Sequence, residues 1–149
     1  INPQLSTRAV NTYENEIKNT NQAMAANQTT TNAMEKQSEI LNNIKEKLQK
    51  FTELTNSEDK QNLLKDIQTK LKDLDDIAKN TTFNSQNLLQ NSKTDSSASQ
   101  ATSYQVGLGK GQVVEIPSLQ SNTQGLNLTT LVNQDPTNFG VEDAQSFLS

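Results

Sequence analysis

The most regular pattern in the chain is an apolar stripe with seven-residue spacing within residues 7–54, a stretch without proline or glycine. The stripe has two rows, namely Val10, Ile17, Met24, Thr31 and Ser38, and Tyr13, Thr20, Asn27, Met34, Leu41 and Leu48. Rows at this spacing share one face of an α-helix, and such a face packs against a partner. The pattern therefore predicts one long helix over residues 7–54, with Ser6 or Thr7 as its N-cap.

The two halves of this predicted helix differ in how apolar their stripe is. Polar residues occupy the middle of the stripe, at Thr20, Asn27, Thr31 and Ser38. Large apolar residues gather in the C-terminal part, at Leu41, Ile44, Leu48 and Phe51. A seam this polar is not stable alone, so we expect the helix to lie in a bundle or against copies of itself.

A helix-start signal introduces a second predicted helix over residues 57–79. Thr55 and Glu58 fit a capping box, and the helix dipole favours the acids Glu58 and Asp59 in the first turn. Its apolar stripe consists of Leu64, Ile67, Leu71, Leu74 and Ala78, with Leu63 and Ile77 beside it. The connection to the first helix is short, which predicts an antiparallel αα-hairpin that covers only the C-terminal half of the long helix.

The segment after the second helix contains turns and a predicted β-hairpin. Residues 80–91 form a turn with an apolar anchor that packs back on the helices, made of Phe83, Leu88 and Leu89. The serine-rich residues 92–103 predict a mobile loop. Residues 104–116 alternate at period two around a Gly109–Lys110–Gly111 turn, which predicts a β-hairpin that ends before Pro117.

The last part of the chain predicts one further helix. Residues 124–132 form a short turn segment in which three leucines are expected to be buried, Leu126, Leu128 and Leu131. A loop over 133–140 precedes residues 141–148, which start a helix with an acidic first turn. We expect this helix to be a piece of a longer one. The predicted fold is mainly α, one elongated rod-like domain over residues 1–149.

Composition supports this picture and excludes several functions. Hydrophobic residues make up 31% and mean hydropathy is -0.78, which suits a rod with little interior. The net charge is -4 and no basic stripe occurs, so we expect no nucleic-acid partner. The chain has no cysteine and no histidine, which removes thiol nucleophiles, disulfides and the commonest zinc ligands. No apolar run is long enough to predict a membrane span.

The remaining candidate motifs have simpler explanations. Gly107, Gly109 and Gly111 form a G-x-G-x-G run, but a second strand rather than a helix is expected to follow, so a hairpin turn is favoured over a phosphate site. Asp73 and its neighbours Asp75 and Asp76 fit a solvated helix face better than a cation loop. Spacing favours core positions for both methionines, Met24 and Met34. We therefore predict no catalytic residue, cofactor or metal site, and no enzymatic activity.

The order of these segments resembles bacterial flagellin. Residues 55–89 are similar to the flagellin pattern T-N-S-x-E-D-R, L-x-x-E-I-D-R-I-A and T-x-F-N-G-x-x-L-L, with Ser85 where the family has glycine. Residues 104–112 resemble the flagellin hairpin F-Q-V-G…G-Q, and residues 124–129 the turn G-L-x-L-T. Residues 21–54 resemble the preceding long helix. The resemblance covers roughly four-fifths of the chain in collinear order.

This resemblance implies an inner-tube domain with a long helix, a shorter helix, a β-hairpin and a returning C-terminal helix. It implies a secreted structural subunit that leaves the cell through the flagellar type III export apparatus with its chaperones. Such a subunit packs through the long helix against other flagellin-type subunits in the filament and serves motility. A hook–filament junction protein shares this domain. The alternative is a short, soluble protein secreted by the flagellum that acts on host or other cells.

The resemblance also implies an altered receptor surface. Many flagellins read L-Q-R-x-R-E-L at the end of the long helix, a surface that contacts a Toll-like receptor and neighbouring subunits. Here the matching and facing residues are Leu41, Asn43, Lys45, Glu46 and Lys47, with Asp73 and Asp76 on the second helix. Asparagine and lysine do not reproduce the planar donor fork of arginine. We therefore expect this receptor to respond weakly or not at all.

Overall fold

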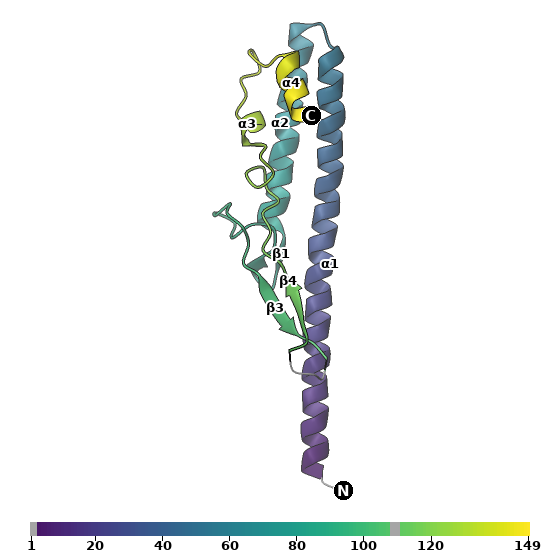
Figure 1. Ribbon diagram of the computed structural model, residues 1–149. Coiled ribbons are helices and arrows are strands. Elements are labelled where there is room, and N and C mark those ends of the chain that lie inside the picture. The colour runs from purple at the N-terminus through teal and green to yellow at the C-terminus, as the bar shows by residue number, and fades with distance from the viewer. Residues whose placement is uncertain (1–2, 108–110) are drawn as a thin grey trace.

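The computed structural model describes residues 3–107 and 111–149, which form an elongated, mainly helical rod as predicted (Figure 1). Helix α1, Pro3–Glu53, runs the length of the rod, and α2, Ser57–Asn80, packs beside its C-terminal half in an antiparallel hairpin. Helix α1 begins at Pro3 and not near Thr7. Proline suits the first position of a helix because its missing N–H would have no intrahelical partner there.

The start of α2 uses a different cap from the predicted one. The Asn56 side chain accepts hydrogen bonds from the backbone N–H groups of Glu58 at 2.8 Å and Asp59 at 3.1 Å. The predicted capping box at Thr55 is therefore wrong. Asparagine is as strong an N-cap as any residue, and its position one step later reaches two of the four free N–H donors of the first turn.

Two apolar clusters hold the rod together. The first joins α1 and α2 to the C-terminal segment, through Ile44, Leu48, Phe51, Leu64, Ile67, Leu71, Leu131, Phe139 and Ala144. The second lies further toward the N-terminal end and consists of Ala26, Ala33, Ala78, Leu88, Leu89 and Ile116. All five predicted stripe residues of α2 are fully buried, and the anchor residues Leu88 and Leu89 pack back on the helices as predicted.

The buried face of α1 agrees with the prediction only in its C-terminal part, where Ile44, Leu48 and Phe51 are buried. Before them the buried residues are Ala23, Ala26, Thr30, Ala33 and Gln37, which are not those of the predicted stripe. One row of this face lies one position before the predicted row, which is about 100° around the helix. Met24 is 64% exposed and Met34 is 42% exposed, so the expectation that they belong to the core is wrong. The side chains of Ala26 and Ala33 are small, so Ile116 can pack close to the helix in the second cluster.

Two small antiparallel hairpins follow α2. The first, β1 Thr82–Phe83 with β2 Gln86–Asn87, was not predicted. The second, β3 Thr102–Gln105 with β4 Val113–Ile116, is the predicted hairpin, although β3 begins two residues earlier. Gly109 and Lys110 of the predicted turn lie outside the described residues. Tyr104 pairs with Val114, and β4 ends directly before Pro117, as expected.

The serine-rich segment is tied to its surroundings by hydrogen bonds. Ser99 is buried, its N–H donates to the Leu119 carbonyl at 2.8 Å, and its Oγ accepts from the Leu119 N–H at 2.8 Å. Thr102 and Ser103, the last two residues of the predicted loop, belong to β3. The mobility of the remaining residues stays a prediction.

A buried polar belt separates the two apolar clusters. Gln37 of α1 donates to the backbone carbonyls of Ser121 at 2.9 Å and Leu74 at 3.3 Å. On α2, the Asp75 carboxylate accepts from the Thr123 N–H at 2.7 Å and from its hydroxyl at 2.9 Å. These bonds attach the extended segment after β4 to both long helices. The expectation that Asp75 belongs to a solvated face is wrong, because it is half-buried in this belt.

The C-terminal segment contains two short helices, α3 Thr129–Val132 and α4 Val141–Leu148. Leu131 is fully buried and Leu128 partly, but Leu126 is 37% exposed and its predicted burial is wrong. Leu126 lies on a turn closed by its own N–H to the Asn122 carbonyl, which directs it outward. Helix α4 has the predicted acidic first turn, and the Asp143 carboxylate accepts from the Gly140 N–H at 2.7 Å.

Candidate partner surface

The seven candidate residues of the predicted receptor surface do not form one surface. Leu41 and Lys45 face the C-terminal segment, where they line a 170 Å³ apolar pocket together with Phe147 and Leu148 of α4. Lys47 faces α2 on the other side of α1, and Glu46 is exposed. The side chains of the five α1 residues therefore point to different sides of that helix.

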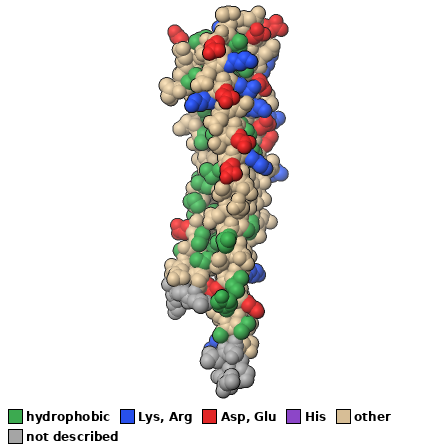
Figure 2. Space-filling model, turned by 90° about the vertical axis from the view of Figure 1, so that its right-hand side faces the viewer, with side chains coloured by type: hydrophobic (Ala, Val, Ile, Leu, Met, Phe, Trp, Pro, Cys, Tyr) green, Lys and Arg blue, Asp and Glu red, His purple; other side chains and the backbone are tan. Residues whose placement is uncertain are grey.

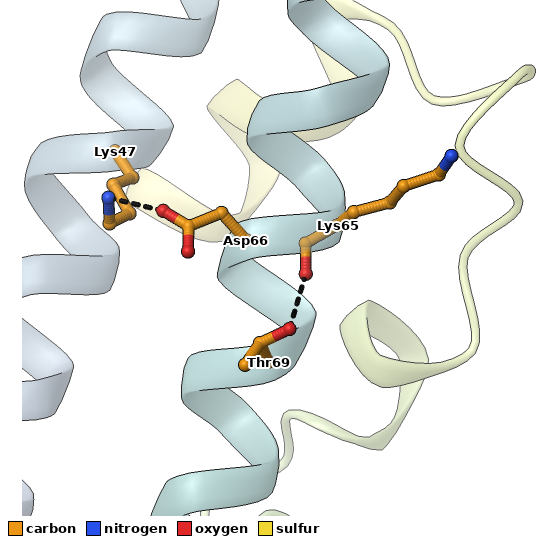
Figure 3. A network of polar contacts seen from close by, with 4 residues as sticks. All are labelled: Lys47, Lys65, Asp66 and Thr69. Carbon is orange, nitrogen blue, oxygen red and sulfur yellow. Dashed lines mark hydrogen bonds and ion pairs between the residues drawn. The ribbon is translucent and has the colours of Figure 1, made fainter.

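Lys47 is engaged within the rod. Its Nζ lies 2.5 Å from a carboxylate oxygen of Asp66 on α2, and the two side chains are 24% and 45% exposed (Figure 3). The neighbouring Lys65 of α2 makes no such pair with α1: its backbone carbonyl accepts from the Thr69 hydroxyl at 3.0 Å, and its amine points away from α1 (Figure 3). An ion pair this exposed contributes at most about 1 kcal/mol, so a partner can displace it.

Asn43 and the two aspartates occupy different environments. Asn43 is half-buried, and its Oδ1 is enclosed without a hydrogen-bond partner among the described residues. Asp73 and Asp76 are exposed on α2, and Asp76 lines an open groove of about 420 Å³ beside Lys36 of α1. Asn43 therefore turns its oxygen inward, whereas the aspartates present negative charge to solvent.

Charges of both signs cover the end of the rod near the α1–α2 connection (Figure 2). A second open groove there is lined by Lys47, Lys50, Leu54, Asp59, Asn62, Leu63 and Asp66. Its lysines belong to α1 and its acids to α2, so the groove carries both signs of charge. Such a mixed surface does not offer the continuous positive charge that nucleic acids require.

Part of the predicted heptad stripe, over residues 10–34 of α1, is exposed in the structure, on the face that was expected to meet a bundle partner or copies of the chain. We call it the exposed stripe, and it consists of Val10, Tyr13, Ile17, Met24 and Met34, which are 42–64% exposed. These are five of the eight large hydrophobic side chains that are exposed among the described residues. Apolar groups that follow one another along a helix face mark an interaction surface, whereas scattered ones do not.

The described residues contain no group of three or more potential metal ligands and no helix apolar enough over sufficient length to cross a bilayer. Hydrogen bonds from the backbone N–H groups of Ser97 and Thr137 lower the pKa values of Asp95 and Asp135, which are turn-capping carboxylates. Strand β4, and not a helix, follows Gly111, as expected for a hairpin turn.

Comparison with known protein families finds one that shares this order of helices. Residues 5–94 match the bacterial flagellin N-terminal helical region, a match that contains α1, α2 and the β1–β2 hairpin almost completely. Among curated proteins, none matches the chain significantly. Because the match covers more than half of its 149 residues, the chain belongs to the bacterial flagellin family.

Proposed function

We propose that this chain is a structural subunit that packs through α1 against other flagellin-type subunits in or near the flagellar filament. The flagellin family is a structural family of the extracellular flagellum, and its members assemble with one another. The exposed stripe supports a role for α1, because most of it lies on the N-terminal half of this helix, which extends beyond α2 (Figure 1).

The energetics favour many weak contacts over one strong pair. Complete burial of a large apolar side chain contributes about 1.5–3 kcal/mol, and the residues of the stripe are already partly shielded by their own helix. Association of two molecules costs about 4–15 kcal/mol in lost freedom and side-chain ordering. One stripe therefore supports only a weak contact, and repetition of the contact along a filament makes the assembly stable.

The same proposal covers export and the absence of catalysis. We expect the protein to leave the cell through the flagellar type III apparatus with chaperone assistance, and to act without enzymatic turnover or a cofactor. Secretion should therefore stop in cells that lack the flagellar export apparatus. Secretion that continues unchanged in such cells would contradict this part of the proposal.

The packing role can be tested with two neighbouring substitutions. Met24→Glu adds a negative charge to the exposed stripe, and Ala25→Glu adds the same charge to an exposed position about 100° around α1. Sedimentation and electron microscopy would follow assembly with filament seeds. We expect Met24→Glu to reduce incorporation strongly and Ala25→Glu to leave it nearly unchanged, with equal helix content in both variants.

The outcomes separate the candidate functions. Equal incorporation of both variants would remove the stripe from the interface. A protein that stays monomeric with every kind of seed, yet is secreted by the flagellar apparatus, would favour the soluble secreted role instead. Incorporation only at filament ends would favour a junction role.

A further inference from the structure

Three asparagines in the chain directly precede serine, in the pairs Asn56–Ser57, Asn84–Ser85 and Asn91–Ser92. The backbone nitrogen after an asparagine can attack the side-chain amide carbon, and a small following residue leaves that approach open. We propose that the fold leaves this reaction unhindered at Asn84 and slows it at the other two asparagines. Asn84 is then a site of spontaneous deamidation.

Hydrogen bonds hold the side chains of the other two asparagines. Asn56 accepts from the N–H groups of Glu58 and Asp59 as the N-cap of α2. Asn91 donates to the Asp95 carboxylate at 2.7 Å and accepts from the Gln100 amide at 3.1 Å. These bonds must open before either amide carbon can meet the nitrogen of the next residue.

A second restraint acts on the nucleophile at one of these sites. The N–H of Ser92 donates to the Asp95 carbonyl at 3.1 Å, so this nitrogen is fixed as well as the Asn91 side chain. Both reacting groups of the Asn91–Ser92 pair are therefore held by the same short turn.

Asn84 and Ser85 form the exposed turn between β1 and β2. Their φ angles are 51° and 64°, the positive values that a two-residue type I′ hairpin turn requires. No described residue forms a hydrogen bond with the Asn84 side-chain amide or with the Ser85 backbone N–H. The electrophile and the nucleophile are therefore both unbound and open to water, in contrast to the other two pairs.

The reaction needs only water as a co-reactant. The Ser85 nitrogen bonds to the Asn84 Cγ and loses its proton, the C–N bond of the side-chain amide breaks, and ammonia leaves. The resulting five-membered succinimide is hydrolysed at either carbonyl. One product carries aspartate at position 84, and the other carries isoaspartate, which lengthens the backbone of the turn by one atom.

The three sites serve as controls for one another in a single sample. The folded protein and the protein unfolded in urea are incubated at mildly alkaline pH, and time points are digested with trypsin. Asn56 falls in the peptide of residues 51–60, whereas Asn84 and Asn91 share the peptide of residues 80–93, so fragmentation in the mass spectrometer assigns the site. Each rate in the folded protein is divided by the rate at the same site in urea, which cancels the influence of sequence neighbours.

We expect this ratio at Asn84 to exceed those at Asn56 and Asn91 by roughly tenfold or more, the factor associated with one hydrogen bond that must first open. Asn84→Gln should abolish the signal at position 84 because the longer side chain would have to close a six-membered ring. A ratio at Asn84 equal to or below those of the other two would overturn the proposal. So would a folded protein in which all three sites are stable while all three react in urea.

Discussion

Gly125 lies where the chain has no room for a side chain, and Gly125→Ala tests the packing of the segment after β4. A Cβ atom built on Gly125 would lie 1.9 Å from the backbone carbonyl oxygen of Gln120 and 2.7 Å from its carbon. Both atoms belong to the backbone, so rotation of a side chain cannot relieve the overlap. The turn itself must move by more than 1 Å to reach an ordinary contact distance of 3.4 Å or more.

The turn cannot move freely because a buried side chain anchors it. Asn122 is only 2% exposed, and its Oδ1 accepts from the Gly125 N–H at 2.8 Å. Its Nδ2 donates to the Gln90 side chain at 3.0 Å and to the Ser96 carbonyl at 2.7 Å. Overpacking costs about 1–3 kcal/mol, and a buried polar group that loses its partner costs a similar amount. We expect Gly125→Ala to destabilise the fold by about 2–4 kcal/mol.

Denaturant unfolding followed by far-UV circular dichroism would measure this change. Gly140→Ala is the matched control, because the nearest atom to its Cβ would be 3.7 Å away and its φ of -111° suits any residue. Alanine is a weaker N-cap than glycine, so the control should cost no more than about 1 kcal/mol. Equal unfolding midpoints for the two variants would refute the steric argument at Gly125.

Three further substitutions test the fold and the candidate surface. Leu71→Ala should cost about 2–4 kcal/mol because it opens a cavity in the first apolar cluster, and a denaturant midpoint unchanged from wild type would remove Leu71 from the core. Ser85→Gly should stabilise the protein by about 0.5–1 kcal/mol, since glycine adopts a φ of 64° without steric cost; a lower thermal midpoint would count against it. In a reporter-cell assay of the flagellin-sensing receptor, we expect weak or absent activation and a gain for Asn43→Arg combined with Lys47→Leu. Potency equal to that of a flagellin with the full arginine motif would show that these positions are misassigned.

The sequence predicted the elements whose signals are local. The length of α1 follows from the absence of proline and glycine over many turns, and α2 follows from large aliphatic side chains at helical spacing. The buried face of α1 before Ile44 could not be found in the same way, because it is built mainly from alanines and Gln37 while larger apolar groups there point outward. The β1–β2 hairpin was missed because Ser85 occupies a position where glycine would have indicated the turn.

The candidate surface shows a different limit of sequence reasoning. Motif alignment selected residues on α1, but which neighbour each one faces depends on segments far along the chain. Lys45 faces the C-terminal helix α4, about 100 residues later, whereas Lys47 meets Asp66 on α2. Phe139 does lie in the predicted loop, but its burial was not foreseen, because its ring packs edge-on against the distant Phe51 with the ring centroids 5.1 Å apart.

The polar belt gives the rod resistance to sliding along its axis. Two helices joined only by aliphatic contacts can exchange one set of neighbours for the next at little cost, because such contacts are not directional. The bonds of Gln37 and Asp75 to the segment that crosses both helices accept no such exchange, since a slip by one residue would leave several buried donors and acceptors unpaired. A force applied along the axis of an elongated protein tends to slide its helices past one another in this direction. The hydrogen bonds of the polar belt therefore fix the position of α1 relative to α2 along the rod axis. The apolar clusters on either side hold the helices together.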